Sequence, residues 1–270
     1  MKRILIACAA LASVMSCTVK ESRLGCPCIL NLDYSKIRQD ERVTTGGYRD
    51  SLLVTVQGLY NAFIRTADYP QYHQISVPRR RAHLNCYFGL TASRLSGDRA
   101  RLEIPLGEDS DRFFSYHQTL ELDEFTEEMY ITPELRNECT TVILSFDEDA
   151  WDTDASRTKM RVSGSSCGLD LNSGYALEGA FIYDMDIHDN HSYCFNMPRQ
   201  AKRDIRIDAV EEDGDVLFSV DLAGELDRAG YNWGAESLPP VVVINMNAQH
   251  IVVDIKIIDW DEAVYFNYYL

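Results

Sequence analysis

Residues 26–35 read CPCILNLDYS, and apolar side chains recur there at every second position. A period of two is typical of a β-strand with one buried face, because successive side chains on a strand point to opposite faces. Cys28, Leu30 and Leu32 then share one face, whereas Asn31 and Asp33 share the other. The stretch therefore predicts a strand at the beginning of the body of the chain.

The same alternation recurs along the chain and predicts about twelve short strands with few helices. The clearest runs are residues 52–56, 84–88, 102–106, 140–146, 205–209, 216–220, 242–246 and 251–257. Asp213-Gly214 between two such runs predicts a hairpin turn. One short helix is expected from Leu222 to Ala229, with Asp221 as its N-cap and Gly230 as its stop. Many short strands with few helices favour an all-β fold built of β-sandwiches.

The N-terminus predicts export and lipid attachment. Lys2 and Arg3 precede an apolar run of about 12 residues, whereas a bilayer span needs roughly 20. Residues 1–16 therefore read as a signal peptide. Ser16-Cys17 is similar to the site where bacterial lipoprotein signal peptidase cuts, so Cys17 is the predicted lipid-attachment residue. The alternative is an ordinary signal peptide followed by a chance cysteine.

The remainder divides into a lipidated tether, 17–27, and two expected domains, 28–155 and 156–270. The acidic stretch at residues 147–154 motivates the boundary. The chain has 42 acidic and 26 basic residues, a net charge of −16. This charge argues against nucleic acid as a partner, since phosphates favour a basic surface, and against adsorption on anionic lipid. The membrane contact is expected to be the lipid anchor alone.

The cysteines and two clusters of polar residues are candidate sites. Export permits disulfides, and six cysteines allow 15 pairings, so their pairing stays open. They are Cys26, Cys28, Cys86, Cys139, Cys167 and Cys194. The residues Asp184, Asp186, His188, Asp189 and His191 are read as an exposed strand face and turn rather than a metal site. The stretch 147–154 lacks the glycine and terminal glutamate of a calcium loop. No metal or cofactor is expected.

The opening residues resemble the start of the FimB-like fimbrial anchor lipoproteins of Bacteroidia-type (type V) fimbriae. The resemblance rests on Cys17, a short polar tether and residues 26–35. A second set follows in the family's order: Phe195-Asn196-Met197-Pro198-Arg199-Gln200, the Asp213-Gly214 hairpin, Gly230-Tyr231-Asn232-Trp233 and Asp259-Trp260. Residues 36–155 match only in strand style.

The resemblance implies two transthyretin-like β-sandwich domains in tandem. It also implies an outer-membrane, surface-exposed lipoprotein that anchors or caps a fimbrial polymer through shaft or accessory subunits. Subunits of such fibres join by strand exchange, in which a strand of one chain completes the sheet of another. At the end of this chain Val264, Phe266, Tyr268 and Leu270 alternate strictly, so they are the speculative donor strand. The alternative is a last strand folded into its own sandwich.

Pro78-Arg79-Arg80-Arg81 reads as a solvated loop, although an arginine-specific protease could cut there or after Arg38, Arg42 or Arg49. No HExxH, P-loop or GxGxxG signature is present, so an enzyme is not expected. The alternative function is a surface adhesin or glycan-binding lipoprotein that uses Trp233 or Trp260. The simpler explanation for these two tryptophans is packing in the core.

Overall fold

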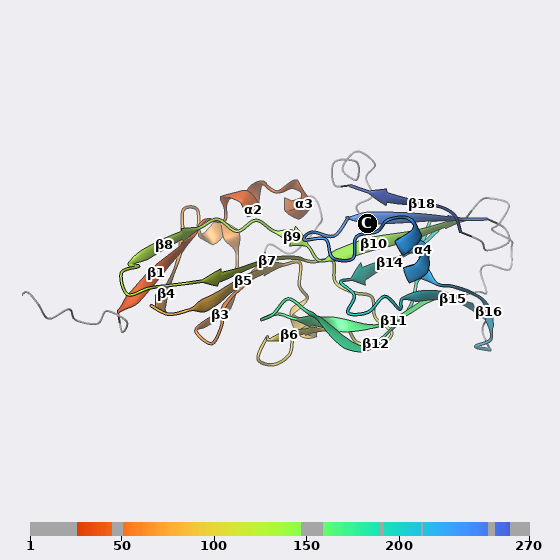
Figure 1. The fold of residues 1–270 in the computed structure, drawn as a ribbon, viewed down its shortest axis with the longest axis horizontal. Coiled ribbons are helices and arrows are strands. Elements are labelled where there is room, and N and C mark those ends of the chain that lie inside the picture. The colour runs from red at the N-terminus through yellow and green to blue at the C-terminus, as the bar shows by residue number, and fades with distance from the viewer. Residues whose placement is uncertain are drawn as a thin grey trace, which may run out of the picture.

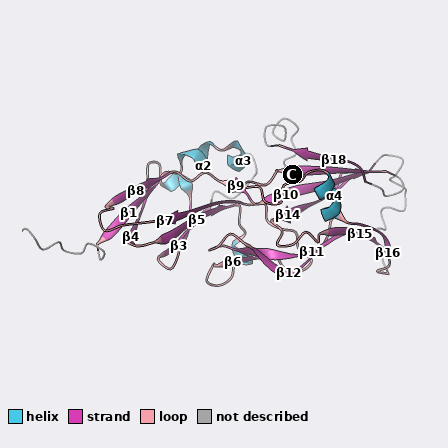
Figure 2. Cartoon of the chain, viewed as in Figure 1, coloured by secondary structure: helices cyan, strands magenta, loops and turns pink. Residues whose placement is uncertain are grey.

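The computed structural model describes residues 26–44, 51–146, 159–189, 192–211, 213–247 and 252–259. Figures 1 and 2 show an elongated molecule made mostly of strands, with a few short helices. The predicted all-β fold class is therefore confirmed. Within the described ranges the strands form two groups of sheets, one toward each end of the long axis (Figure 1).

The first group contains a three-stranded sheet, β4-β1-β8, and a five-stranded sheet, β3-β2-β5-β7-β9. These strands are β1 (Pro27–Leu32), β2 (Leu52–Val56), β3 (Tyr60–Ile64), β4 (His73–Pro78), β5 (Ala82–Phe88), β7 (Phe114–Leu120), β8 (Glu128–Ile131) and β9 (Arg136–Asn137). The apolar faces of the two sheets enclose one core that includes Leu30, Val54 and Phe114. Four short helical segments join its strands: α2 (Ser35–Gln39), α3 (Glu41–Thr44), η2 (Thr66–Asp68) and η3 (Ala92–Arg94). Alternation in the sequence did not predict them.

The second group contains the sheets β13-β14-β10-β17-β18 and β12-β11-β15-β16, with β6 added beside β11. Its strands are β6 (Arg101–Glu103), β10 (Cys139–Phe146), β11 (Lys159–Asp170), β12 (Ala176–Asp184), β13 (Asp186–Asp189), β14 (Ser192–Pro198), β15 (Arg206–Val210), β16 (Val216–Val220), β17 (Val241–Met246) and β18 (Val252–Ile258). A second core between these sheets includes Val142, Phe195 and Ile244.

Local turn and cap chemistry was predicted correctly in this group. Helix α4 spans Leu222–Arg228, and the carboxylate of Asp221 accepts a hydrogen bond from the Gly224 backbone N–H at 3.1 Å. Gly230 follows the helix with φ of 80°, a conformation that glycine adopts without strain. β15 and β16 pair antiparallel across the Asp213-Gly214 turn.

Strand β10 is hydrogen-bonded to strands of the second group. It pairs antiparallel with β14 and parallel with β17, whereas the boundary expected near residue 155 puts residues 139–146 in the first domain. Alternation shows which residues of a strand face a core, but it carries no information about which strands lie beside it. The boundary expected near residue 155 falls in residues 147–158, outside the described part.

A third apolar cluster connects the two groups. Leu53 and Tyr87 on the outer face of β2 and β5 pack with Leu102, Leu169 and other residues near β6 and β11. Strand β2 is consequently buried on both faces. Strand β6 is shorter than the run predicted at 102–106, and Leu106 beyond it is exposed.

Candidate functional site

The first strand occupies the centre of its sheet rather than an edge. β1 pairs antiparallel with β4 and parallel with β8, and Leu30 stands opposite both Ile75 and Met129. Cys28, Leu30 and Leu32 are fully buried, as the alternation predicted. The chain that precedes β1 is the predicted tether. The strand that follows the predicted tether is therefore hydrogen-bonded to a neighbour on each side.

The arginines that follow β1 hold the chain in place. The guanidinium of Arg38 donates to the carbonyl oxygens of Thr66, Tyr69 and Pro70 at 3.1–3.3 Å. Arg42 pairs with the carboxylate of Asp40 and donates to the carbonyl oxygen of Leu135. These contacts make both arginines structural. Arg49 lies outside the described residues.

The arginine run at 79–81 is less exposed than expected. Arg79 is buried and donates to the carbonyl oxygen of Glu124 at 2.5 Å, while Arg81 pairs with Glu121 at 3.3 Å. The reading of a solvated loop is thus wrong for Arg79, because its guanidinium has a backbone partner on the chain leading to β8.

A buried carboxylate lies where the chain crosses from β9 to β10. Glu138 accepts hydrogen bonds from the hydroxyl of Ser115 at 2.5 Å and from Nε of Arg199 at 2.7 Å. Its neighbour Asn137 is fully buried and donates to the carbonyl oxygen of Leu238. These bonds connect β7 of the first group to chain segments of the second group.

A second contact across the groups centres on Asp109. Its carboxylate accepts from the backbone N–H and the amide of Asn196 on β14, at 2.9 and 2.8 Å. Arg94 donates to the backbone carbonyl of Asp109 at 2.6 Å. Burial raises the pKa of Asp109 to about 6, although the hydrogen bonds from Asn196 and Ser110 oppose the shift. Hydrogen bonds of Asp109 and Glu138 therefore connect the two groups of sheets. Neither residue was predicted from the sequence.

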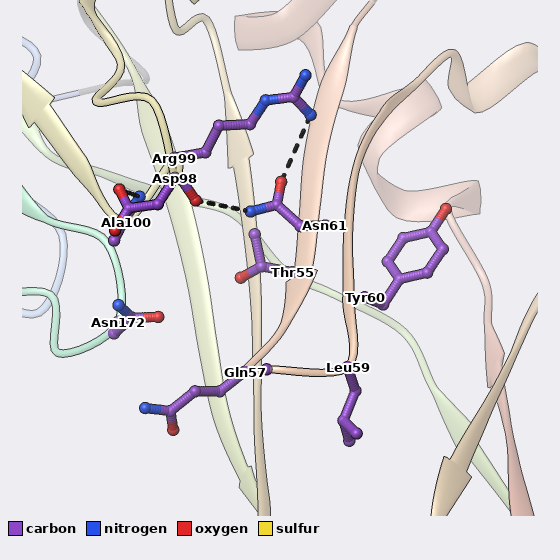
Figure 3. Close-up of a pocket in the computed structure, with 10 residues that line it drawn as sticks. Thr55, Gln57, Leu59, Tyr60, Asn61, Asp98, Arg99, Ala100 and Asn172 are labelled. Carbon is purple, nitrogen blue, oxygen red and sulfur yellow. Dashed lines mark hydrogen bonds between the residues drawn. The ribbon is translucent and has the colours of Figure 1, made fainter.

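A polar pocket of about 350 Å³ opens beside the β2–β3 hairpin (Figure 3). Asn61 accepts from Arg99 and donates to the carbonyl oxygen of Asp98, at 3.5 and 3.3 Å. Figure 3 shows Asn172, from the turn after β11, on the opposite side of the pocket from Tyr60, whose ring points away. Arg99 has φ of 54°, a strained backbone conformation for a residue with a side chain. The pocket lies where the two groups meet, but it offers no exposed aromatic face.

Trp233 is a packing residue. Its ring lies against the second core and meets Tyr231 edge-on, with the ring centroids 4.8 Å apart. Its indole N–H donates to the Asp227 carboxylate at 2.7 Å. Both ends of the side chain therefore have partners, as the packing explanation expected. Trp260 lies outside the described residues.

The remaining candidate sites are the polar cluster that begins at Asp184, the cysteines and the proposed donor strand. Asp184 pairs with Arg161 at 2.6 Å. Among the described residues no group of three or more histidine, cysteine or acidic side chains is placed to hold a metal. Cys28, Cys86 and Cys139 are buried, and burial raises the pKa of each thiol. Cys17 and the speculative donor residues Val264, Phe266, Tyr268 and Leu270 lie outside the described part, as does the acidic stretch 147–154.

No helix in the described part of the chain is long and apolar enough to cross a membrane. No protein-family model matches the sequence, and no curated protein matches it.

Solved structures do resemble the fold. A candidate polysaccharide-binding protein from Bacteroides thetaiotaomicron aligns with a TM-score of 0.61 at 12% identity, covering 88% of this chain and 99% of that protein. The fimbrial anchor protein Mfa2 from Porphyromonas gingivalis aligns with a TM-score of 0.58 at 13% identity, covering 87% and 98%. A candidate adhesin from Bacteroides thetaiotaomicron aligns with a TM-score of 0.54 at 13% identity, covering 87% and 97%. The chain thus has the fold of a Bacteroidia fimbrial anchor protein and of candidate adhesins, which confirms the resemblance at the level of fold.

Proposed function

We propose that this protein anchors or caps a fimbrial polymer at the outer membrane. In this proposal residues 1–16 direct export, and acyl chains on Cys17 hold the mature protein in the membrane. Two or more chains anchor a protein stably, whereas one short chain holds it only reversibly. The body has a mechanical and binding role rather than a catalytic one, which agrees with the fimbrial and adhesin-type neighbours.

The observation that carries the proposal is the position of β1. The strand that follows the tether is the middle strand of its sheet, hydrogen-bonded to β4 and β8. A force applied along the tether would have to break both ladders together and expose Leu30 and Leu32 to water. Burial of one leucine side chain stabilises a fold by roughly 1.5–3 kcal/mol. An edge strand, paired on one side only, would separate more easily.

The contacts of Arg38 and Arg42 support an uncut chain between β1 and β2. Both guanidiniums are engaged with carbonyl or carboxylate oxygens of the folded body. A protease subsite needs the arginine side chain extended and accessible. Retention of β1 is what an anchor requires, since cleavage after either residue would separate the body from its lipid.

The proposed partners are fimbrial shaft or accessory subunits, joined by strand exchange. The alternation of Val264, Phe266, Tyr268 and Leu270 gives one apolar row that fits a groove, while backbone hydrogen bonds supply affinity. A second candidate function is adhesion through glycans. Trp233 does not support it, but an exposed tyrosine-lined pocket at the start of β4 does.

Substitution of the lipid-attachment residue tests the anchor proposal. We expect Cys17→Ala to leave the protein without acyl chains and to shift fimbriae from the cell surface into the medium, measured by immunoblotting both fractions. Cys26→Ala is the matched control, because Cys26 is an exposed cysteine near the end of the tether and should leave the fimbriae attached. Fimbriae that stay on Cys17→Ala cells would contradict the proposal.

A further inference from the structure

An open pocket of about 670 Å³ lies at the start of β4 and shares Tyr60 with the pocket in Figure 3. Its lining residues are Tyr60, Tyr69, Gln71, Tyr72, His73 and Gln74. None of these side chains carries a charge at neutral pH, since burial lowers the pKa of His73. In a chain with 68 charged side chains, 26 basic and 42 acidic, an uncharged lining is distinctive.

The walls of this tyrosine pocket are held in place before any ligand arrives. His73 is buried, and its two ring nitrogens lie 2.8 Å from the hydroxyl of Tyr34 and 3.1 Å from that of Tyr60. The ring of Tyr69 lies over the His73 ring, with centroids 4.2 Å apart. Arg38 fixes the backbone carbonyl of Tyr69 from helix α2. Such preorganisation lowers the entropy cost of binding.

Three polar groups of the tyrosine pocket have no hydrogen-bond partner within the described residues: the hydroxyls of Tyr69 and Tyr72 and the side-chain amide of Gln71. Tyr72 is 46% exposed, and its ring meets the ring of the exposed residue Tyr130 edge-on, with centroids 5.4 Å apart. The side-chain nitrogen of Gln74 donates to the amide oxygen of Asn31, which leaves the side-chain oxygen of Gln74 available to a ligand. The pocket thus combines an exposed aromatic face with uncharged donors and acceptors.

We propose that the tyrosine pocket binds a neutral saccharide. Sugar hydroxyls donate and accept hydrogen bonds, which matches tyrosine hydroxyls and glutamine amides. The C–H face of a sugar ring packs on an aromatic ring, which offers an apolar face and a polar edge. An anionic ligand would find no cation in this lining. The volume falls within the usual range for small-molecule sites, about 300–1,000 Å³.

The location agrees with access from outside the cell. His73 stands opposite Leu32 at the far end of β1, whereas the tether joins the sheet at Pro27, opposite Pro78. The pocket is therefore at the end of the strand away from the predicted membrane attachment. This inference rests on adhesion, the second candidate function above, and gives that function a site and a ligand class. It does not depend on the anchor function, since it uses no residue of the tether or of the proposed donor strand.

Glycan-array binding by the full-length protein tests the proposal. The protein is extracted in a detergent without sugar headgroups and applied to neutral hexose, N-acetylhexosamine and acidic oligosaccharides. We expect binding to neutral glycans. Tyr72→Ala should weaken the binding to the best of these by about tenfold or more, as expected for removal of a central aromatic contact.

Tyr175→Ala is the matched control, because Tyr175 is 76% exposed and lies on the second group of sheets. It should bind as the unchanged protein does. Tyr69→Phe keeps the ring and removes only the hydroxyl, so it should weaken binding while the melting temperature stays the same. No neutral-glycan binding, binding to acidic glycans alone, or equal affinities for Tyr72→Ala and Tyr175→Ala would each overturn the proposal.

Discussion

Glu138 shows how a single residue joins the two groups of sheets. Glu138 is 6% exposed, and its carboxylate has partners on both sides, Ser115 from β7 and Arg199 after β14. Removing one member of a buried pair leaves the other charge without its partner in a poorly solvated place.

We therefore expect Glu138→Ala to lower the free energy of unfolding by about 3–5 kcal/mol, measured by urea denaturation. Glu236→Ala is the matched control, since the Glu236 pair with Arg136 is exposed on both sides. Its loss should be about 1 kcal/mol or less. Equal losses for the two variants would show that the buried carboxylate is not a connection between the groups.

Buried titratable residues set the pH dependence of stability. Burial lowers the pKa of His73 and of His117 in the fold. In the unfolded chain a histidine takes up a proton below a pH of about 6.5, so the unfolded state then binds more protons than the native state. The histidines thus make the free energy of unfolding fall as the pH drops below that value.

Asp109 acts in the opposite direction. Because its pKa is raised to about 6, Asp109 adds to the free energy of unfolding at low pH, and this addition is lost as the pH rises through that value. We expect Asp109→Asn to lose melting temperature more steeply on acidification than the unchanged protein, measured by calorimetry between about pH 7.5 and about pH 5.5. A shallower loss in Asp109→Asn would show that the carboxyl does not have a raised pKa.

A residue's role could be predicted from the sequence where its partners are near neighbours in the chain. Asp221 and Gly230 were predicted correctly, because a cap and a helix stop depend on neighbours within a few positions. Glu138 and Asp109 depend on partners far along the chain. The tyrosine pocket had a local signal, the uncharged aromatic run Tyr69-Pro70-Gln71-Tyr72-His73-Gln74, which alternation alone does not single out.

At the scale of elements, the contact of β6 with β11 connects the groups through the backbone. Gly168 of β11 stands opposite Glu103, and a Cβ atom at Gly168 would lie 2.0 Å from the carbonyl oxygen of Leu102. A backbone oxygen cannot move aside as the end of a flexible side chain can. The strand pair therefore requires glycine at this position.

Gly168→Ala should consequently lower the free energy of unfolding by about 3 kcal/mol, the upper end of overpacking costs. Gly164→Ala in the same strand is the control, because the nearest atom to its Cβ would be 3.5 Å away, an ordinary contact. Thermal denaturation of both variants tests the difference. A Gly168→Ala protein as stable as Gly164→Ala would rule out the close approach of β6.

Strand alternation predicted most of these elements but not their neighbours. The register of one strand is encoded in its own residues, whereas the placement of β10 beside β17 depends on chain closure across 100 residues, from Val142 to Val242. Strand β2 carries apolar residues on both faces, Leu52 and Leu53, because β6 and β11 cover its outer side. The sequence predicted only an alternating strand at residues 52–56, and Leu53 between Leu52 and Val54 departs from that alternation.

At the scale of the whole molecule, the fold gives the anchor proposal its physical basis. The tether enters the middle of one sheet, and hydrogen bonds at Glu138, Asn137 and Asp109 connect that group of sheets to the other. A load on a fimbrium held by the second group would thus reach the lipid through bonded elements.

Recovery of the protein with its partners tests the central claim most directly. The full-length protein is extracted from outer membranes in mild detergent, captured with an antibody and run on a denaturing gel with and without boiling. The anchor proposal predicts a high-mass ladder that contains fimbrial subunits and collapses on heating, as strand-exchanged assemblies do. A single band near the mass of the monomer, with no fimbrial subunit recovered, would contradict it.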